Sequence, residues 1–71
     1  MEMGEITIVF SPGGEKRRIV VDESMRVREL LKTLLLDEES VVVVRGDEVL
    51  TEDRVVRPGE ILTVFNVMSG G

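Results

Sequence analysis

Hydrophobic and polar residues alternate at the start of the chain, in the pattern of a β-strand with one buried face. Residues 5–10 place two isoleucines and a phenylalanine on one side and a threonine on the other. Ser-Pro-Gly-Gly at 11–14 then supplies the restricted and the positive φ values that a tight reversal needs. Residues 15–21 start polar and bring Ile19 and Val21 to one face. We therefore predict a β-hairpin.

A helical period replaces this alternation in the next segment. Hydrophobic residues recur at i, i+3, i+4, i+7 and i+8, which is one apolar stripe of an amphipathic helix: Val27, Leu30, Leu31, Leu34 and Leu35. Acidic and hydroxyl side chains at 22–24 suit the positive end of a helix, but Arg26 with Glu29 three positions later fits its first turn equally well. The pattern predicts one helix and leaves its first residue open.

Short apolar segments separated by turns fill the second half of the chain. Four consecutive valines at 41–44 indicate a strand with apolar surroundings on both faces. Gly-Asp at 46–47 predicts a turn into a short strand at 48–50. Arg-Pro-Gly-Glu at 57–60 has Pro and Gly in the two central positions of a type II turn, and a last strand at 61–68 is largely apolar on both faces.

The predicted order is strand, strand, helix, strand, short strand, strand. With a single helical stripe, the core must lie between the helix and one face of the sheet. The last strand fits the centre of that sheet, beside the first strand, because both of its faces are apolar. This arrangement is an α+β β-grasp, a mixed four- to five-stranded sheet packed on one helix, in a single domain at 1–71. Other strand orders also satisfy the pattern alone.

The strand alternation and the helical stripe together predict a core. Its members are Ile6, Ile8, Ile19, Val21, Val27, Leu30, Leu31, Leu34, Val42, Leu50, Leu62 and Val64. With Val42 in the core, Val43, Phe65 and Val67 point the opposite way and form an exposed apolar patch. We predict that this patch, together with Met68, binds a partner protein.

Composition excludes several classes of function. The 71 residues contain no Cys and no His, which removes thiol nucleophiles, thiolate zinc sites and imidazole bases. Fourteen acidic residues against nine basic ones give a net charge of −5, which disfavours binding to phosphate backbones. No apolar run approaches the roughly 18 residues that span a bilayer, and no signal-peptide pattern is present. We expect a monomeric cytoplasmic protein that is not an enzyme and binds neither metal, nucleic acid nor membrane.

Two charged clusters offer weak candidate chemistry. The carboxylates of Glu38 and Glu39 fall in a predicted loop, without a histidine or an aromatic wall that would complete an active site. Lys16, Arg17 and Arg18 could bind phosphate, but no aromatic residue is interleaved with them and no Gly-rich loop opens a helix nearby. A charged strand edge that resists edge-to-edge pairing explains them better.

The stronger candidate is the C-terminus, Ser69-Gly70-Gly71, which follows directly from an apolar strand. We expect residues 68–71 to form a flexible tail that reaches at most about 14 Å from the sheet. Gly70 and Gly71 lack a Cβ atom, so they fit a channel too narrow for other residues. The carboxylate of Gly71 is therefore the predicted reactive group.

Residues 41–49, 57–61 and 65–71 carry a resemblance to a known family. In these segments, and over essentially the whole chain, the sequence resembles the ubiquitin-like sulfur carriers and small archaeal modifiers. This family includes the thiamine-pathway carrier ThiS, the molybdopterin-synthase small subunit MoaD and the ubiquitin-related modifiers. MoaD proteins tend to have a Phe-Pro-Pro-like stretch before the final glycines, whereas this chain has Phe-Asn-Val-Met at 65–68. That difference disfavours the molybdopterin role.

The resemblance implies that an ATP- and magnesium-using enzyme adenylates the Gly71 carboxylate. Attack by sulfur would then give a thiocarboxylate for thiamine-type or tRNA-type sulfur transfer, and attack by a lysine amine would give an isopeptide bond. The chain would hold no cofactor of its own and supply no catalytic side chain, since the adenylating enzyme and a sulfurtransferase or biosynthetic acceptor provide them. The alternative is a non-covalent β-grasp interaction module with an inert tail.

The net charge adds one expectation about the encounter with the activating enzyme. An acidic carrier of charge −5 should approach a basic surface on that enzyme, so association should slow as the salt concentration rises.

Overall fold

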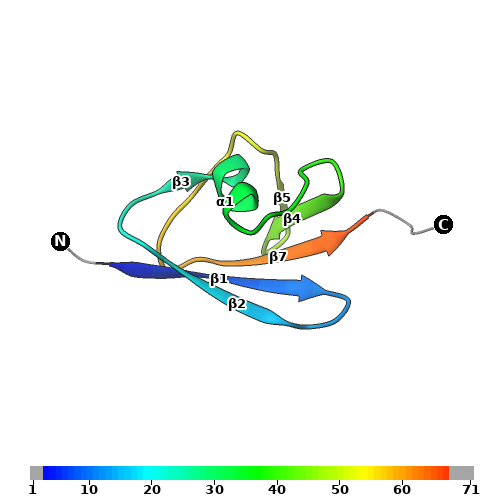
Figure 1. Ribbon diagram of the computed structural model, residues 1–71, viewed down its shortest axis with the longest axis horizontal. Helices are drawn as coiled ribbons and strands as arrows, with labels where there is room; N and C mark the ends of the chain where they lie inside the picture. The colour runs from blue at the N-terminus through cyan, green and yellow to red at the C-terminus, as the bar shows by residue number, and fades with distance from the viewer. Residues whose placement is uncertain (1–2, 68–71) are drawn as a thin grey trace.

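The computed structural model describes residues 3–67, which form a five-stranded sheet with one helix across one of its faces (Figure 1). The helix is α1 (Val27–Thr33). The strands of the sheet are β1 (Gly4–Ser11), β2 (Lys16–Val21), β4 (Val41–Arg45), β5 (Glu48–Leu50) and β7 (Ile61–Asn66).

The order of the strands across the sheet is β2-β1-β7-β4-β5. β1 and β7 run parallel, and every other neighbouring pair is antiparallel. The last strand therefore occupies the centre beside the first, and the predicted β-grasp is confirmed. Two short strands, β3 (Met25–Arg26) and β6 (Val55–Val56), form a separate antiparallel pair that the sequence did not predict.

All three predicted turns are present, and the first and the last are closed by the following backbone hydrogen bonds. In the β1–β2 turn, the Phe10 N–H donates to the Glu15 carbonyl at 2.7 Å. In the turn before β7, the Glu60 N–H donates to the Arg57 carbonyl at 3.2 Å. Gly59 has a φ of 94°, the positive value that the third position of a type II turn requires.

The helix begins at Val27, so the alternative based on Arg26 and Glu29 is the correct one. The Arg26 N–H donates to Glu29 Oε1 at 3.2 Å, as in a capping box. The next two N–H groups, which have no partner within the helix, donate to loop carbonyls of Arg54 and Glu52 at 2.9 Å each.

The helix ends earlier than its apolar stripe suggests. Leu34 is the C-terminal cap and is buried, but Leu35 is 92% exposed and adopts a φ of 61°. The Leu35 N–H donates to the Lys32 carbonyl and the Leu36 N–H to the Leu31 carbonyl, which is the bonding pattern of a Schellman motif. Leu35 therefore does not belong to the buried stripe.

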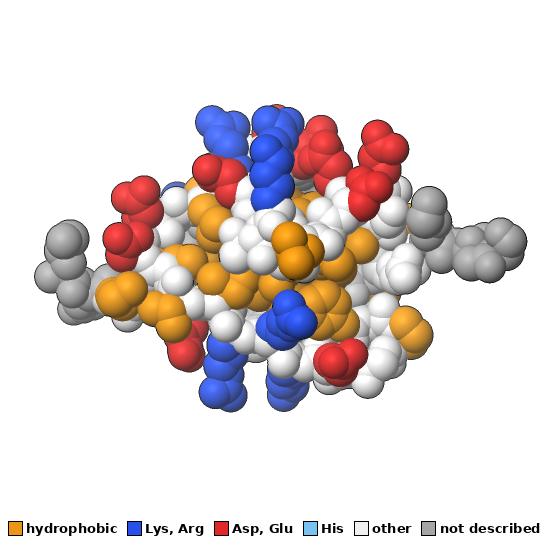
Figure 2. All heavy atoms as spheres, in the orientation of Figure 1, with side chains coloured by type: hydrophobic (Ala, Val, Ile, Leu, Met, Phe, Trp, Pro, Cys, Tyr) orange, Lys and Arg blue, Asp and Glu red, His pale blue; other side chains and the backbone are white. Residues whose placement is uncertain are grey.

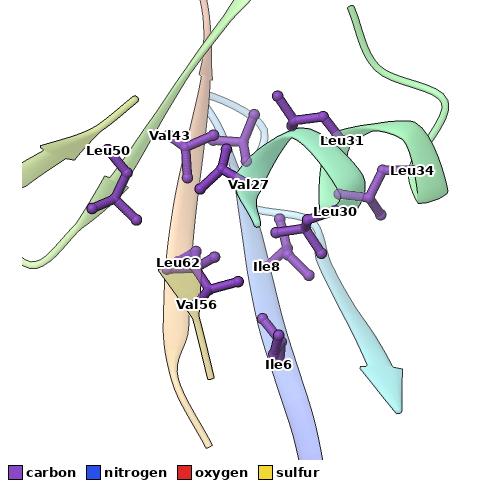
Figure 3. Close-up of a cluster of buried hydrophobic side chains, with 11 residues drawn as sticks. Ile6, Ile8, Val27, Leu30, Leu31, Leu34, Val43, Leu50, Val56 and Leu62 are labelled. Atoms are coloured by element: carbon purple, nitrogen blue, oxygen red, sulfur yellow. The ribbon is translucent and has the colours of Figure 1, made fainter. Parts of the chain in front are cut away.

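The core lies between α1 and the sheet face beneath it (Figure 3). Its buried side chains are Ile6, Ile8, Val27, Leu30, Leu31, Leu34, Val43, Leu50, Val56, Leu62 and Val64. The predicted members Ile19 and Val21 are only partly buried and pack against this cluster from the edge strand β2. Val56 was missed because a two-residue strand in a polar segment carries no periodic signal.

The prediction that Val42 is a core residue was wrong. Val43 pairs with Val64 and is 2% exposed, whereas Val42 pairs with Phe65 on the opposite face. Four successive valines do not indicate which pair of alternate residues points inward, and a shift of one residue exchanges the two faces.

Candidate functional site

The sheet face opposite α1 carries a group of apolar side chains from four adjacent strands. In the register, Val42 lies opposite Phe65, and Val44 lies opposite both Thr63 and Val49. We call the following residues the outer patch: Val9, Val42, Val44, Val49, Ile61 and Phe65. Ile61, Val49 and Phe65 are its most exposed members, and the three others are partly buried.

The outer patch corrects one of the predicted partner-binding residues. Val43 is in the core and cannot reach this face, and Val42 takes its place. Phe65 and Val67 are 41% and 55% exposed, as the alternation along the last strand predicted. Met68, also predicted to bind a partner, lies outside the described residues.

Sequence reasoning also missed the other members of the outer patch. Val44, Val49 and Ile61 are contributed by three different strands, and Val9 comes from a fourth. None of these strands shows the patch alone, because it forms only when the register aligns them. The β4–β5 turn at 46–47 was the available signal, since a two-residue turn places Val44 opposite Val49.

β7 carries the chain from the centre of the sheet to the C-terminal segment. It is hydrogen-bonded to β1 on one side and to β4 on the other. Just beyond it, the Val67 N–H donates to the Ser40 carbonyl at 3.0 Å. The backbone is thus held up to residue 67, at the end of the sheet where the β1–β2 turn also lies (Figure 1). The predicted reactive residues Ser69, Gly70 and Gly71 lie outside the described residues.

Ion pairs connect β4, β5 and the segment before β7, at the end of the sheet away from residue 67. Arg45 bridges Glu60 at 3.1 Å and Glu48 at 3.2 Å, and Arg54 contacts Glu48 at 2.8 Å. Hydrogen bonds from Arg45 and Arg54 lower the pKa of Glu48. The hydrogen bonds that Arg45 donates to Glu48 and Glu60 raise the pKa of Arg45. These groups tie the β4–β5 hairpin to the segment before β7 and are engaged with one another.

Among residues 3–67, no cluster of three or more His, Cys, Asp or Glu side chains could hold a metal ion. Within the same range, no helix has the length and apolar character needed to cross a membrane.

A β-grasp sheet whose central strand leads to a C-terminal Gly-Gly defines the class of ubiquitin-like carriers. Comparison with known families agrees, since the model of the ThiS family matches residues 8–71. The chain belongs to the ThiS family. Sulfur carrier protein TtuB from Thermus thermophilus is 40% identical over 57 residues, which cover 80% of this chain and 88% of TtuB. The resemblance found in the sequence is thereby confirmed, and proteins of this family are small carriers and not enzymes.

Proposed function

We propose that this protein is a sulfur carrier whose Gly71 carboxylate is the group that carries the sulfur. The observation that supports it best is the position of β7, a central strand that pairs with β1 and β4 and leads directly into the segment containing Gly70 and Gly71. Family membership and the similarity to a protein named as a sulfur carrier support the same proposal.

The chemistry would proceed in two steps on a partner enzyme. A carboxylate is a poor electrophile, so an oxygen of Gly71 first attacks the α-phosphorus of magnesium-bound ATP, and pyrophosphate leaves. Hydrosulfide (HS⁻) then attacks the acyl carbon, AMP leaves, and loss of the sulfur-bound proton gives a thiocarboxylate. The acceptor of that sulfur would be a thiamine-type or tRNA-type pathway. A lysine amine that attacks the same adenylate would give an isopeptide bond instead.

The carrier's own contribution is to present its tail while a second surface holds it in place. Four extended residues span about 14 Å, enough to enter a narrow active-site channel. The outer patch suits the holding role, because an apolar cluster on adjacent strands is a protein-binding feature and this one continues along β7 toward the tail. We place this encounter with the adenylating enzyme in the cytoplasm.

The test is intact-mass analysis after incubation with the cognate activating enzyme, magnesium-ATP and a sulfur donor. Replacement of one carboxylate oxygen by sulfur raises the mass by about 16 Da, and fragmentation should locate the change at Gly71. Deletion of Gly71 should abolish the shift and leave the melting temperature unchanged. Gly70→Val should also suppress it, because a branched side chain obstructs a channel that admits only backbone.

The competing function, a non-covalent interaction module with an inert tail, predicts a different outcome. Such a protein would bind its partner through the outer patch, and the mass of Gly71 would not change in any condition. An unmodified Gly71 in a reaction where another ThiS-family protein is converted would refute the carrier function.

A further inference from the structure

The outer patch has a basic margin on one side. Lys16 and Arg18 of the edge strand β2 are exposed and pair with Val9 and Thr7 of β1, so they share the face of the outer patch. Figure 2 shows basic side chains projecting from the lower side of the molecule, away from α1. These cations lie one strand away from the apolar side chains of the outer patch.

The basic margin is not neutralised by neighbouring carboxylates. The ion pairs among residues 3–67 involve Arg28, Arg45 and Arg54, and none joins Lys16 or Arg18 to an acid. On the outer face of the described sheet strands, Glu5 is the one carboxylate, and it lies near the start of β1, away from the end where β7 leaves the sheet. The outer face therefore has a local charge opposite in sign to the net charge of −5.

Distance determines which of these charges a docking partner meets. Charges further apart than about 8 to 10 Å are largely screened at physiological salt. A helix with its side chains is itself about 10 to 12 Å thick, so the acidic residues beyond α1 are more than one screening length from a partner on the outer face. Lys16 and Arg18 lie at the margin of the contact, where charge governs the association rate.

We propose that the protein surface that docks on the outer patch is apolar at its centre and carries carboxylates where it faces β2, with Lys16 and Arg18 steering the encounter. The inference rests on the proposed function, since it takes the activating enzyme to be the docking partner. The net charge of −5 led us to expect a basic surface on the activating enzyme, whereas the basic margin predicts an acidic one.

Two double variants with the same net charge separate these possibilities. Lys16→Glu/Arg18→Glu reverses the basic margin. Lys32→Glu/Arg57→Glu makes the same change in total charge on α1 and in the loop before β7, at exposed residues that form no ion pair among residues 3–67. Stopped-flow association with the activating enzyme is measured without ATP, at about 0.05 M and about 0.5 M salt, where screening is weak and strong respectively.

At low salt, the association rate constant of Lys16→Glu/Arg18→Glu should fall by about tenfold or more, and that of the control should stay within about twofold of the unmodified protein. The three rate constants should converge at high salt. Equal effects of the two variants, or faster association of either, would overturn the inference in favour of net charge. Lys16→Gln/Arg18→Gln should associate at an intermediate rate. This neutral variant tests the same charges if the charge-reversed variant misfolds.

Failure of this inference is distinguishable from failure of the proposed function. Binding without ATP does not depend on the chemistry at Gly71, and the mass shift does not depend on which charges steer association. If Gly71 is converted to the thiocarboxylate and Lys16→Glu/Arg18→Glu associates at the same rate as the unmodified protein, only the steering role of the basic margin is refuted. Margin-dependent binding with no mass shift refutes the carrier chemistry alone, and absence of both binding and a mass shift refutes both.

Discussion

Leu31 is 3% exposed and belongs to the cluster of buried hydrophobic side chains (Figure 3). Leu31→Ala should lower the free energy of unfolding by about 2 to 5 kcal/mol, because it removes buried methyl groups and leaves a cavity. Urea or thermal unfolding measures the change. Leu35→Ala is the matched control, since it makes the same substitution four residues later on a side chain that is 92% exposed.

Equal melting temperatures for the Leu31→Ala and Leu35→Ala variants would contradict the core assignment. The expected loss is large for a domain of 71 residues, because small proteins are stable by only about 5 to 15 kcal/mol in total.

For individual residues, the sequence predicted the core correctly wherever polar neighbours showed which side of the strand is buried. Ile6 and Ile8 flank Thr7, and both were predicted correctly. The four valines of β4 have no such marker, and their inward face is set by hydrogen bonding to β7, a contact between distant parts of the chain. Val42 was accordingly assigned to the wrong face, and the outer patch was predicted with Val43 in its place.

Among the secondary-structure elements, the end of α1 contains an unfavourable residue. The Schellman motif requires a positive φ at Leu35, where a leucine Cβ costs about 1 to 2 kcal/mol and glycine costs little. Leu35→Gly should therefore raise the free energy of unfolding by about 1 kcal/mol, since the side chain removed is exposed and contributes little packing. Thermal unfolding tests this.

Leu35→Ala is again the control, because alanine retains the Cβ atom that causes the strain. The two variants remove almost the same exposed surface, so a difference between their melting temperatures isolates the backbone effect. A lower melting temperature for Leu35→Gly than for Leu35→Ala would contradict the strain at this position.

Element types and turns followed from the sequence, but the two shortest strands did not. β3 and β6 contribute two residues each, and neither has a periodic pattern long enough to detect. They form only because the loop at 52–54 is brought to the start of α1, where its carbonyls accept the first N–H groups of the helix.

For the whole molecule, the ion pairs around Glu48 predict a dependence of stability on pH. The pKa of Glu48 is lowered in the folded protein by the hydrogen bonds from Arg45 and Arg54. A carboxylate with a lowered folded pKa stabilises the fold above its ordinary pKa of 4.5, and this contribution is lost as the pH falls through the lower folded value. Glu48→Gln should thus be less stable than the unmodified protein at pH 7. The two should be equally stable at a pH below the lowered pKa of Glu48, where the carboxyl group is protonated.

Urea unfolding at a series of pH values from 7 downward measures this difference. Glu23→Gln, at an exposed residue that forms no ion pair among residues 3–67, is the control and should follow the unmodified protein. A gap between Glu48→Gln and the unmodified protein that stayed constant with pH would mean that the side chain acts through packing and not through its charge.

The distribution of charge over the surface is the whole-molecule property that composition conceals. Counting residues gives a net charge of −5 and suggests an acidic surface throughout. The strand register instead brings Lys16 and Arg18 to the face that also carries the outer patch. The candidate tail was predicted from residues adjacent in sequence, whereas the outer patch depends on strands brought together by folding.

The parallel pairing of β1 with β7 has a mechanical consequence. β1 begins at one end of the sheet and β7 finishes at the other, so a force that pulls the C-terminal segment away from the N-terminal one loads all the hydrogen bonds between these strands in shear. Shear requires those bonds to break together, whereas a hairpin peeled from its open end loses them one at a time. If the tail enters an enzyme channel as proposed, this pairing lets the protein be pulled out by its tail while its sheet stays folded.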